Sequence, residues 1–141
     1  MAKLEVTIDV IVHATEDITK FFKSFNEMFD LEETIFSVSN VTGHFKNSIL
    51  IIRAKITKKP ARVFLEKFLK ILSENQKMEL IQEIEERTGN SALHIRFDKQ
   101  EFVRGRITFK EEEAIKLKIH TPIYNKKDTI KVFSEIFQEL D

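Results

Sequence analysis

The stretch Leu4-Glu5-Val6-Thr7-Ile8-Asp9-Val10-Ile11-Val12 alternates aliphatic residues with mostly polar ones. Because successive side chains of a β-strand point to opposite faces, this period of two predicts a strand with one buried face. Residues 93–97 alternate in the same way, and residues 49–57 are rich in branched aliphatic side chains, so both segments are also predicted strands. Weaker strands are predicted at residues 32–38, 107–109 and 115–121, and the last two are expected to pair with each other.

Helical patterns lie between these strands. Thr15-Glu16-Asp17 suits the N-cap and first turn of a helix, and apolar residues three and four apart continue the pattern to Phe29. Pro60 suits the first position of a second helix, and the Ser73 and Gln76 pair matches the capping box of a third helix that is expected to reach Arg87. A short helix or turn within Asp98–Gly105 and a longer helix over Asp128–Leu140 complete the prediction.

The order of these elements predicts the fold class. Neighbouring strands are joined by short links, which favours a largely antiparallel sheet with the helices on one face, an α+β two-layer sandwich. The sequence has no repeat, no low-complexity tract and no long linker, so residues 1–141 are expected to form a single domain. Most of the 13 Phe residues lie on helical stripes, and about ten are expected in the core.

Composition excludes several classes of protein. The chain has 141 residues and no Cys, so neither a disulfide framework nor a thiolate zinc site is available, and a reducing compartment suits it. The longest apolar run, Ile49–Ile52, ends at Arg53 and is far too short to cross a bilayer. No secretory signal is recognisable, so we expect a cytoplasmic protein without membrane contact.

Charge is unevenly distributed although the formal net charge is zero, with 23 basic and 23 acidic residues. Residues 49–72 contain seven basic residues and one acidic residue, and residues 91–110 contain five and two. Since screening limits electrostatic reach to about 8–10 Å, local fields matter more than the total for binding a polyanion. The two segments would form one basic face if the fold brings them together.

A loop is predicted over Ser39–Ser48, and its second half carries a chemically mixed set of side chains. Gly43, His44, Lys46 and Asn47 offer conformational freedom, an imidazole, an ammonium and an amide. Such a set can stack on a base, contact phosphate and bond a base edge, as recognition of unpaired RNA requires. The alternative is an ordinary hairpin connection whose Phe45 packs into the core.

A second candidate site begins at Arg96-Phe97-Asp98-Lys99-Gln100, where a predicted strand ends. Arg96, Lys99 and Gln100, joined by Arg104 and Arg106, could contact phosphates and bases. The alternative is that Asp98 caps a strand-to-helix junction surrounded by solvated charges. Arg53 belongs to a basic corner over residues 53–62, which is interpreted as a protected sheet edge, or as a phosphate-binding group if it adjoins Arg96.

Enzyme motifs are absent. The sequence has no phosphate-binding glycine loop, no H-E-x-x-H and no nucleophile elbow, and its four histidines have no partner at helical spacing. We therefore expect no catalytic residues, no cofactor and no metal. A histidine-based ribonuclease or a metal site built from residues distant in the sequence stays open as a minor alternative.

Three motifs together resemble a known family. Val12–Asp17, the Gly43-His44 loop and Arg96–Gln100 occur in the order seen in archaeal small RNA-binding proteins described as predicted exosome subunits, and Ile84–Arg87 also fits. The resemblance covers about residues 5–120, and Arg96–Gln100 is its most specific part. It implies a fold similar to that of the large-subunit ribosomal protein that binds 5S RNA, RNA binding without catalysis, and exosome subunits as further partners.

The resemblance carries over to particular residues. It implies that Gly43, His44 and Asn47 form one RNA-binding loop, and that Asp98, Lys99, Gln100 and Gly105 form the second motif. Lys46 stands where the family usually has Gly, Ser48 where it often has Pro, and Glu101-Phe102 where it has small or aromatic residues. The zero net charge and the many Phe residues support a different reading, a protein-interaction adaptor or oligomer-building subunit, such as a homodimer, without direct RNA contact.

Overall fold

A computed structural model of the protein describes residues 3–42 and 47–141. The chain divides into two compact units. Unit 1 comprises Met1–Val6, Ile56–Ile95 and Lys118–Asp141, and unit 2 comprises Thr7–Lys55 and Arg96–Leu117. The expected single domain stays a prediction, which one cooperative unfolding transition followed by two different probes would support.

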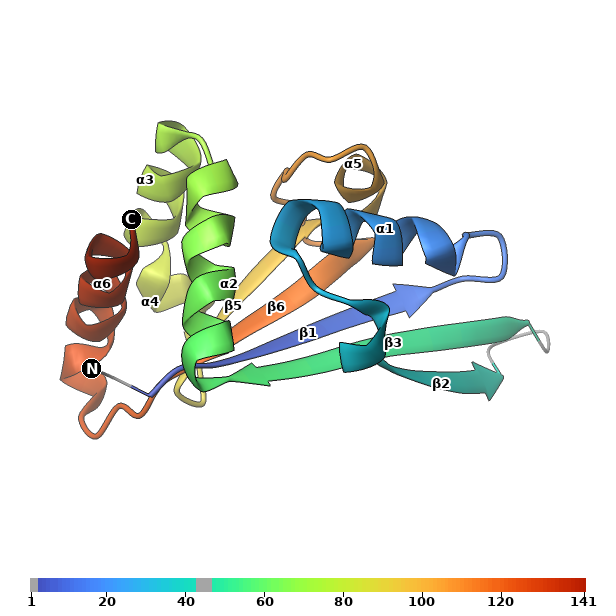
Figure 1. Ribbon diagram of the computed structural model, residues 1–141. Coiled ribbons are helices and arrows are strands. Elements are labelled where there is room, and N and C mark those ends of the chain that lie inside the picture. The colour runs from blue at the N-terminus through green and yellow to red at the C-terminus, as the bar shows by residue number, and fades with distance from the viewer. Residues whose placement is uncertain (1–2, 43–46) are drawn as a thin grey trace. The chain divides into compact units, whose positions relative to one another are not determined.

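Six strands form one antiparallel sheet, as the sequence predicts, with the order β2-β3-β1-β6-β5-β4 (Figure 1). In chain order the strands are β1 (Glu5–Val12), β2 (Ser37–Thr42), β3 (Ser48–Thr57), β4 (Thr88–Gly89), β5 (Ala92–Asp98) and β6 (Ala114–His120). Buried residues alternate with half-buried ones along β1, β5 and β6, and with exposed ones along the second half of β3. This alternation gives each of these strands one face toward the core and one toward solvent.

In unit 2, helices α1 (Ile18–Phe29) and α5 (Lys99–Val103) cover one face of the strands (Figure 1). The packing is aromatic. The ring centroid of Phe102 in α5 lies 4.6 Å from that of Phe25 in α1 and 5.5 Å from that of Phe97 in β5. Phe36, which follows the 3-10 turn η1 (Glu33–Ile35), lies 4.8 Å from Phe25. Eleven Phe side chains are buried in the described chain, which agrees with the expected use of Phe as core.

Unit 1 is mainly helical. Its helices are α2 (Lys58–Ile71), α3 (Glu74–Gln82), α4 (Ile84–Arg87) and α6 (Thr129–Leu140), the last preceded by the 3-10 turn η3 (Lys126–Asp128). Helix α6 packs against α2 and α4. The predicted capping box of α3 is confirmed, because the Ser73 hydroxyl accepts from the Gln76 N–H at 3.1 Å and the Gln76 side chain accepts from the Ser73 N–H at 3.0 Å.

Four element predictions need correction. The strand predicted at 32–38 lies instead at Ser37–Thr42, where pairing with β3 outweighs a polar sequence. Helix α2 begins at Lys58, so Pro60 is its third residue, and the helix expected over 74–87 is broken at Glu83. Residues 107–109 form only an isolated bridge, in which Phe109 pairs with Phe97 of β5 and not with β6.

Within residues 3–42 and 47–141, no helix combines the length and the apolar character needed to cross a membrane.

Candidate nucleic-acid interface

The face of the unit 2 strands that lies opposite α1 and α5 carries a group of cations. On β3, Arg53 and Lys55 are exposed and alternate with the buried residues Ile52, Ala54 and Ile56. On β6, Lys116 lies between the buried Ile115 and Leu117. On β5, Arg96 lies between the buried Ile95 and Phe97. Strand periodicity therefore places Arg53, Lys55, Arg96 and Lys116 on one side, which we call the basic sheet face.

One carboxylate lies among these cations. The Arg53 Nε donates to Asp9 Oδ1 on β1, and this contact raises the pKa of the Arg53 guanidinium above its already high ordinary value. The Arg96 guanidinium makes a 3.4 Å contact with the carbonyl oxygen of Glu111. Among the described residues, Lys116 has no ion pair. The basic sheet face thus carries four cations of unit 2, and one of them, Arg53, is already bonded to the Asp9 carboxylate.

The other side chains of this face are small, polar or aliphatic. Ser37 and Ser39 of β2 share the face, because they pair with Arg53 and Ile51 of β3. Ile11 of β1 is 41% exposed. Within the described part of unit 2, no aromatic ring lies on this face, since Phe97 and its bridge partner Phe109 belong to the opposite side. Such a surface can contact phosphates, and it lacks the rings on which unpaired bases stack.

Lys99 lies elsewhere, and it is buried. Its side chain is 3% exposed, and its Nζ donates to the Ile11 carbonyl oxygen at 2.8 Å and to Glu16 Oε1 at 2.9 Å. Glu113 Oε2 is 3.3 Å away. The ammonium is therefore surrounded by protein oxygens, and Lys99 has no donor left to offer to a ligand at the surface. Asp98 caps α5 by accepting from the Glu101 N–H at 2.8 Å, which is the capped junction considered as the alternative.

Gln100, Arg104 and Arg106 belong to α5 and to the turn that follows it. All three are exposed. Arg104 lies 3.5 Å from one carboxylate oxygen of Glu101, and Arg106 lies 2.9 Å from the other. Gly105 between them has a φ of 82°, a left-handed conformation that suits Gly. These residues lie beside α5, on the helical side of the strands, and not on the face that carries Arg53 and Arg96.

The first candidate loop is only partly described. Gly43, His44 and Lys46 lie outside the described residues, so their predicted roles stay predictions. Asn47 is exposed and immediately precedes β3. Next to it, the Ser48 hydroxyl donates to the Asn40 side-chain oxygen at 3.0 Å, joining the β2 and β3 ends of this hairpin.

The predicted site residues are thus divided among three places. Arg53 and Arg96 share the basic sheet face, Lys99 is buried, and Gln100, Arg104 and Arg106 lie beside α5.

Sequence reasoning missed Lys116. Its signal was present, because Lys116 alternates with Ile115 and Leu117 in a predicted strand, and this pattern places a cation on the solvent face. Within the described chain, no group of three His, Cys, Asp or Glu residues could hold a metal ion.

The fold and this face define an α+β protein whose sheet is covered by helices on one side of unit 2 and is basic on the other. A family model described as "RNA binding" matches residues 5–121. This match spans most of the chain, and the protein therefore belongs to this RNA-binding family, as the motifs in the sequence indicated.

Solved archaeal structures support the assignment. A DUF54 protein from Archaeglobus fulgidus is 27% identical, with a TM-score of 0.80 over 96% of this chain and 99% of that one. One from Sulfolobus solfataricus is 25% identical, with a TM-score of 0.77 over 96% of each chain. A third, from Methanothermobacter thermautotrophicus, is 23% identical, with a TM-score of 0.75 over 97% of this chain and 99% of that one, and it shows the shared fold. No curated protein matches the sequence.

Proposed function

We propose that the protein binds RNA without catalysis, and that the basic sheet face of unit 2 contacts the phosphate backbone. One observation carries the proposal: Arg53, Lys55, Arg96 and Lys116 gather on one face of the unit 2 strands, and Lys116 has no ion pair among the described residues. Membership of the RNA-binding family supports the choice of ligand. This arrangement also provides a local positive field in a chain with zero net charge.

The chemistry of the face favours backbone contact over base reading. Lys and Arg side chains bind phosphate oxygens in any sequence, whereas base recognition in single strands depends on stacking rings. A face of strands that offers cations, hydroxyls and aliphatic side chains therefore suits the surface of a structured RNA. We expect affinity to depend steeply on salt and weakly on sequence, because each phosphate contact releases counterions.

The test compares two lysines of unit 2. In Lys116→Ala, fluorescence anisotropy with a labelled stem-loop RNA at several salt concentrations should show weaker binding and a slope of log K against log salt that is shallower by about 1. Lys20→Ala is the matched control, since Lys20 is an exposed lysine of α1 on the other side of the strands and should change little. If both variants bind as the wild type does, the basic sheet face is not the interface.

Other candidate contacts belong to the same proposal. The loop residues Gly43, His44, Lys46 and Asn47 would add a stacking ring and an amide that the sheet face lacks, and Gln100, Arg104 and Arg106 would add contacts beside α5. A variant with His44→Ala should lose affinity mainly for unpaired RNA, whereas Lys116→Ala should lose it for every RNA. Equal losses on paired and unpaired RNA would contradict a stacking role for His44.

We further propose a cytoplasmic role as an accessory factor of the archaeal RNA exosome. The support is the resemblance of Val12–Asp17 and Arg96–Gln100 to proteins described as predicted exosome subunits. Affinity purification of the full chain with and without nuclease tests it. Exosome subunits retained after nuclease treatment would support direct contact. Their complete loss would show that RNA alone connects them to this protein.

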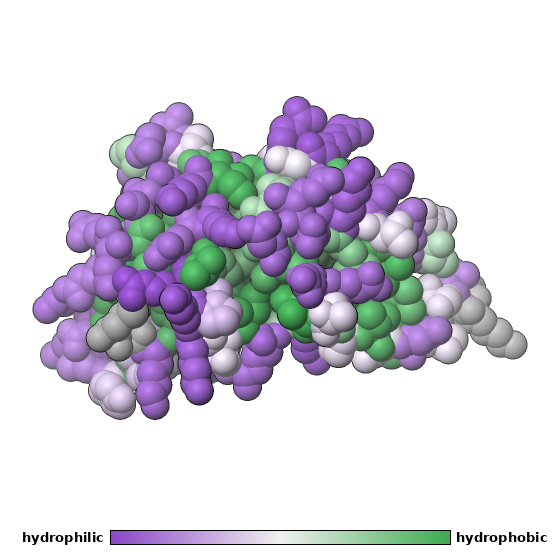
Figure 2. Space-filling model, in the orientation of Figure 1, coloured by the Kyte–Doolittle hydropathy of each residue, from purple (hydrophilic) through white to green (hydrophobic). Residues whose placement is uncertain are grey.

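One observation favours a protein–protein contact as a second candidate. Strand β2 is an edge strand with no charged residue, all six of its residues are exposed, and Val38 and Val41 are 49% and 41% exposed. Hydrophobic surface is visible over β2 and β3 in Figure 2. Uncharged edges of this kind pair readily with another strand, so a homodimer through β2 is the adaptor-type alternative. Light scattering of the wild type and of Val38→Lys tests this alternative. A dimer in the wild type and a monomer in the variant would support the contact through β2, and a monomer in both would contradict it.

A further inference from the structure

Tyr124 lies in a surface segment of unit 1 that the proposed sheet interface does not use. It is the single tyrosine of a chain without tryptophan, and it is 97% exposed. It lies between β6 and η3, beyond residue 121, where the family match ends. Tyrosine side chains usually bury much of their ring against other residues, because burial of this large surface is favourable. In Tyr124 both faces of the ring are open to a ligand.

The turn that follows the ring is held by hydrogen bonds. The Asn125 side-chain oxygen accepts from the Lys127 N–H at 3.1 Å, and the Asn125 carbonyl oxygen accepts from the Asp128 N–H at 2.9 Å. The Thr129 hydroxyl donates to the Lys126 carbonyl oxygen at 2.9 Å, which joins the turn to the start of α6. Binding residues are often placed on short segments that a rigid scaffold positions, because less entropy is then lost when a ligand binds.

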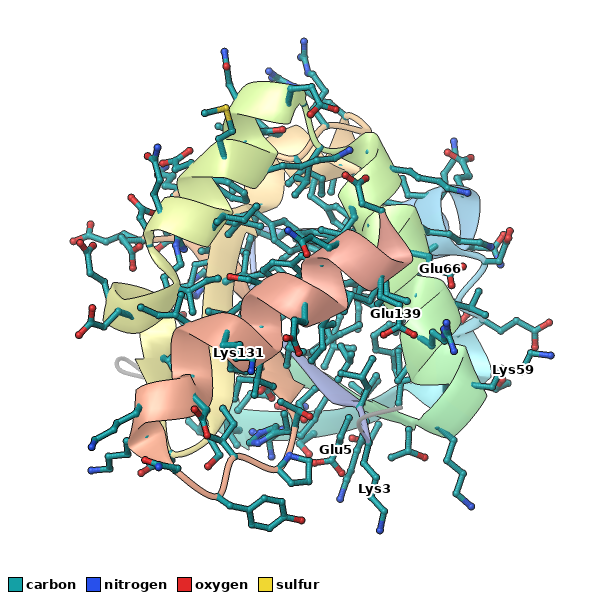
Figure 3. All side chains as sticks on the ribbon, turned by 90° about the vertical axis from the view of Figure 1, so that its left-hand side faces the viewer. Lys3, Glu5, Lys59, Glu66, Lys131 and Glu139 are labelled. Atoms are coloured by element: carbon teal, nitrogen blue, oxygen red, sulfur yellow. The ribbon has the colours of Figure 1, made fainter. Side chains whose placement is uncertain are left out.

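Two lysines of this turn are free to contact phosphate. Lys126 and Lys127 are exposed, and neither forms an ion pair with a described residue. Residues 114–127 contain four lysines and no acidic residue, and Asp128 is the first carboxylate after them. Figure 3 shows Lys131 in the first turn of α6, and it is exposed as well. The ring of Tyr124 is therefore followed by a locally basic segment.

An open ring next to unpaired lysines favours an unpaired nucleotide over a protein as the ligand. Tyrosines that anchor protein–protein contacts lie in well-packed centres of an interface, where lysine is depleted. The four residues after Tyr124 are Asn, Lys, Lys and Asp, and all of them are exposed. Proteins that bind single-stranded nucleic acids combine cations that contact the backbone with aromatic rings on which bases stack. The Tyr124 segment has both of these components.

We propose that residues 124–127 bind an unpaired nucleotide of an RNA strand. The base stacks on the Tyr124 ring, and Lys126 and Lys127 contact the adjoining phosphates. This inference rests on the proposed RNA binding, and it supplies in unit 1 the stacking ring that the basic sheet face of unit 2 lacks. Because every base has a face that can stack, we expect this segment to discriminate unpaired from paired RNA and to show little preference among sequences.

The single tyrosine gives a direct measurement of stacking. The ring protons of Tyr124 are the only tyrosine signals in the NMR spectrum of the full chain. The titrant is an RNA of about ten alternating adenosines and cytidines, which cannot pair with itself. We expect the ring signals to move upfield, because a stacked base shields them, with the dissociation constant that fluorescence anisotropy of the labelled strand gives. A blunt RNA duplex offers no free base and should leave the ring signals in place.

Two pairs of variants assign the response to this segment. Tyr124→Leu should weaken binding of the unpaired strand about tenfold, whereas Tyr124→Phe keeps a stacking ring and should bind nearly as the wild type does. Because Tyr124 is 97% exposed, both variants should melt at the temperature of the wild type. Lys127→Ala should make the slope of log K against log salt shallower by about 0.7. Lys59→Ala, at an exposed lysine of α2 in the same unit, should change neither affinity nor slope (Figure 3).

The outcomes separate this site from the basic sheet face. If RNA binds but the Tyr124 signals stay in place and Tyr124→Leu binds normally, this segment is not a contact, and the proposed RNA binding stands. If the ring signals move while Lys116→Ala binds normally, the sheet face is not the interface and this site stands. If no RNA binds at low salt, both proposals fail. Ring signals that move with protein concentration alone would show contact with a second copy of the chain and overturn the assignment to RNA.

Discussion

The Nζ atom of Lys99 lies 2.9 Å from Oε1 of Glu16, at a place where the Lys99 side chain is 3% exposed. The same ammonium donates to the Ile11 carbonyl oxygen at the end of β1, and Glu113 Oε2 lies 3.3 Å away. Glu16 in turn accepts from the His13 N–H at 2.9 Å. One buried cation thus joins the end of β1, the turn before α1, the start of α5 and the acidic segment before β6.

We expect Lys99→Met to lower the free energy of unfolding by about 3 kcal/mol, because it removes a buried cation and leaves the half-buried Glu16 carboxylate without its partner. Urea denaturation of the variant and the wild type measures the change. Glu16→Gln completes a double-mutant cycle, and the loss in the double variant should be at least about 1 kcal/mol smaller than the sum of the single losses. Simple additivity would show that the two side chains do not interact.

Acid should weaken this contact. Burial acts to raise the pKa of Glu16, but the hydrogen bonds from the His13 N–H and the Lys99 ammonium outweigh it and hold the pKa of the carboxyl below its ordinary value of 4.5. A lowered folded-state pKa adds stability that is complete above pH 4.5 and is lost as the pH falls through the folded pKa. Between pH 5 and pH 3 the wild type should therefore lose more stability than Glu16→Gln.

Asp17 provides an internal check on that comparison. Hydrogen bonds from the Thr19 hydroxyl and N–H lower the pKa of Asp17 as well, and the wild type and Glu16→Gln both retain Asp17. The difference between the two acid titrations, followed by circular dichroism, thus reports the protonation of Glu16. If the two proteins lose stability in parallel as the pH falls, the pKa of Glu16 is not lowered in the folded state.

The capping box of α3 should contribute measurably to stability. Ser73→Ala removes the acceptor for the Gln76 N–H and should lower the free energy of unfolding by about 1 kcal/mol. Thr57→Ala at the N-cap of α2 is the matched control, since the Thr57 side chain makes no cap hydrogen bond there, and it should change stability by less than about 0.5 kcal/mol. Thermal melts of both variants measure the contrast, and equal losses would show that the capping bond is not the cause.

Gly105 should resist substitution for a conformational reason alone. A Cβ at this residue would meet nothing within 4 Å, yet its φ of 82° is one that side chains rarely adopt, so Gly105→Ala should cost about 1 kcal/mol. At Gly89 the nearest atom to an added Cβ is His94 Nε2 at 3.9 Å, an ordinary contact, and Gly89→Ala should be nearly neutral. A larger loss of stability in Gly89→Ala than in Gly105→Ala would show that steric space, and not the φ angle, decides whether a side chain is tolerated at these residues.

The sequence predicted strands and helices correctly where the pattern that identifies them lies within a single segment of the chain. The alternation in residues 4–12 and 93–97, the spacing in residues 18–29 and the Ser73-Gln76 pair each identified an element correctly. Strand β2 was misplaced because its stability comes from a partner strand and not from its own polar residues. Phe109 was assigned to the wrong neighbour for the same reason, since bridge partners depend on the path of the chain through the Gly105 turn.

The site was harder to predict because burial of a charge leaves no mark in the sequence. Lys99 has the same local neighbours whether it points to solvent or to Glu16, and only the arrival of β1 and the acidic segment decides between them. Arg53 and Arg96 were identified by local charge density, and both lie on the basic sheet face. Lys116 was overlooked because it lies in residues 111–141, where acidic residues outnumber basic ones and only strand periodicity distinguishes it.

The way the chain is distributed between its units has a consequence for dissection of the protein. Unit 1 takes its residues from three separate stretches of the sequence, and unit 2 from two that are interleaved with them. Neither can be released by a single proteolytic cut or expressed as one continuous fragment. A protease that nicks one exposed connection would leave complementary pieces that must associate again before either unit regains all of its parts.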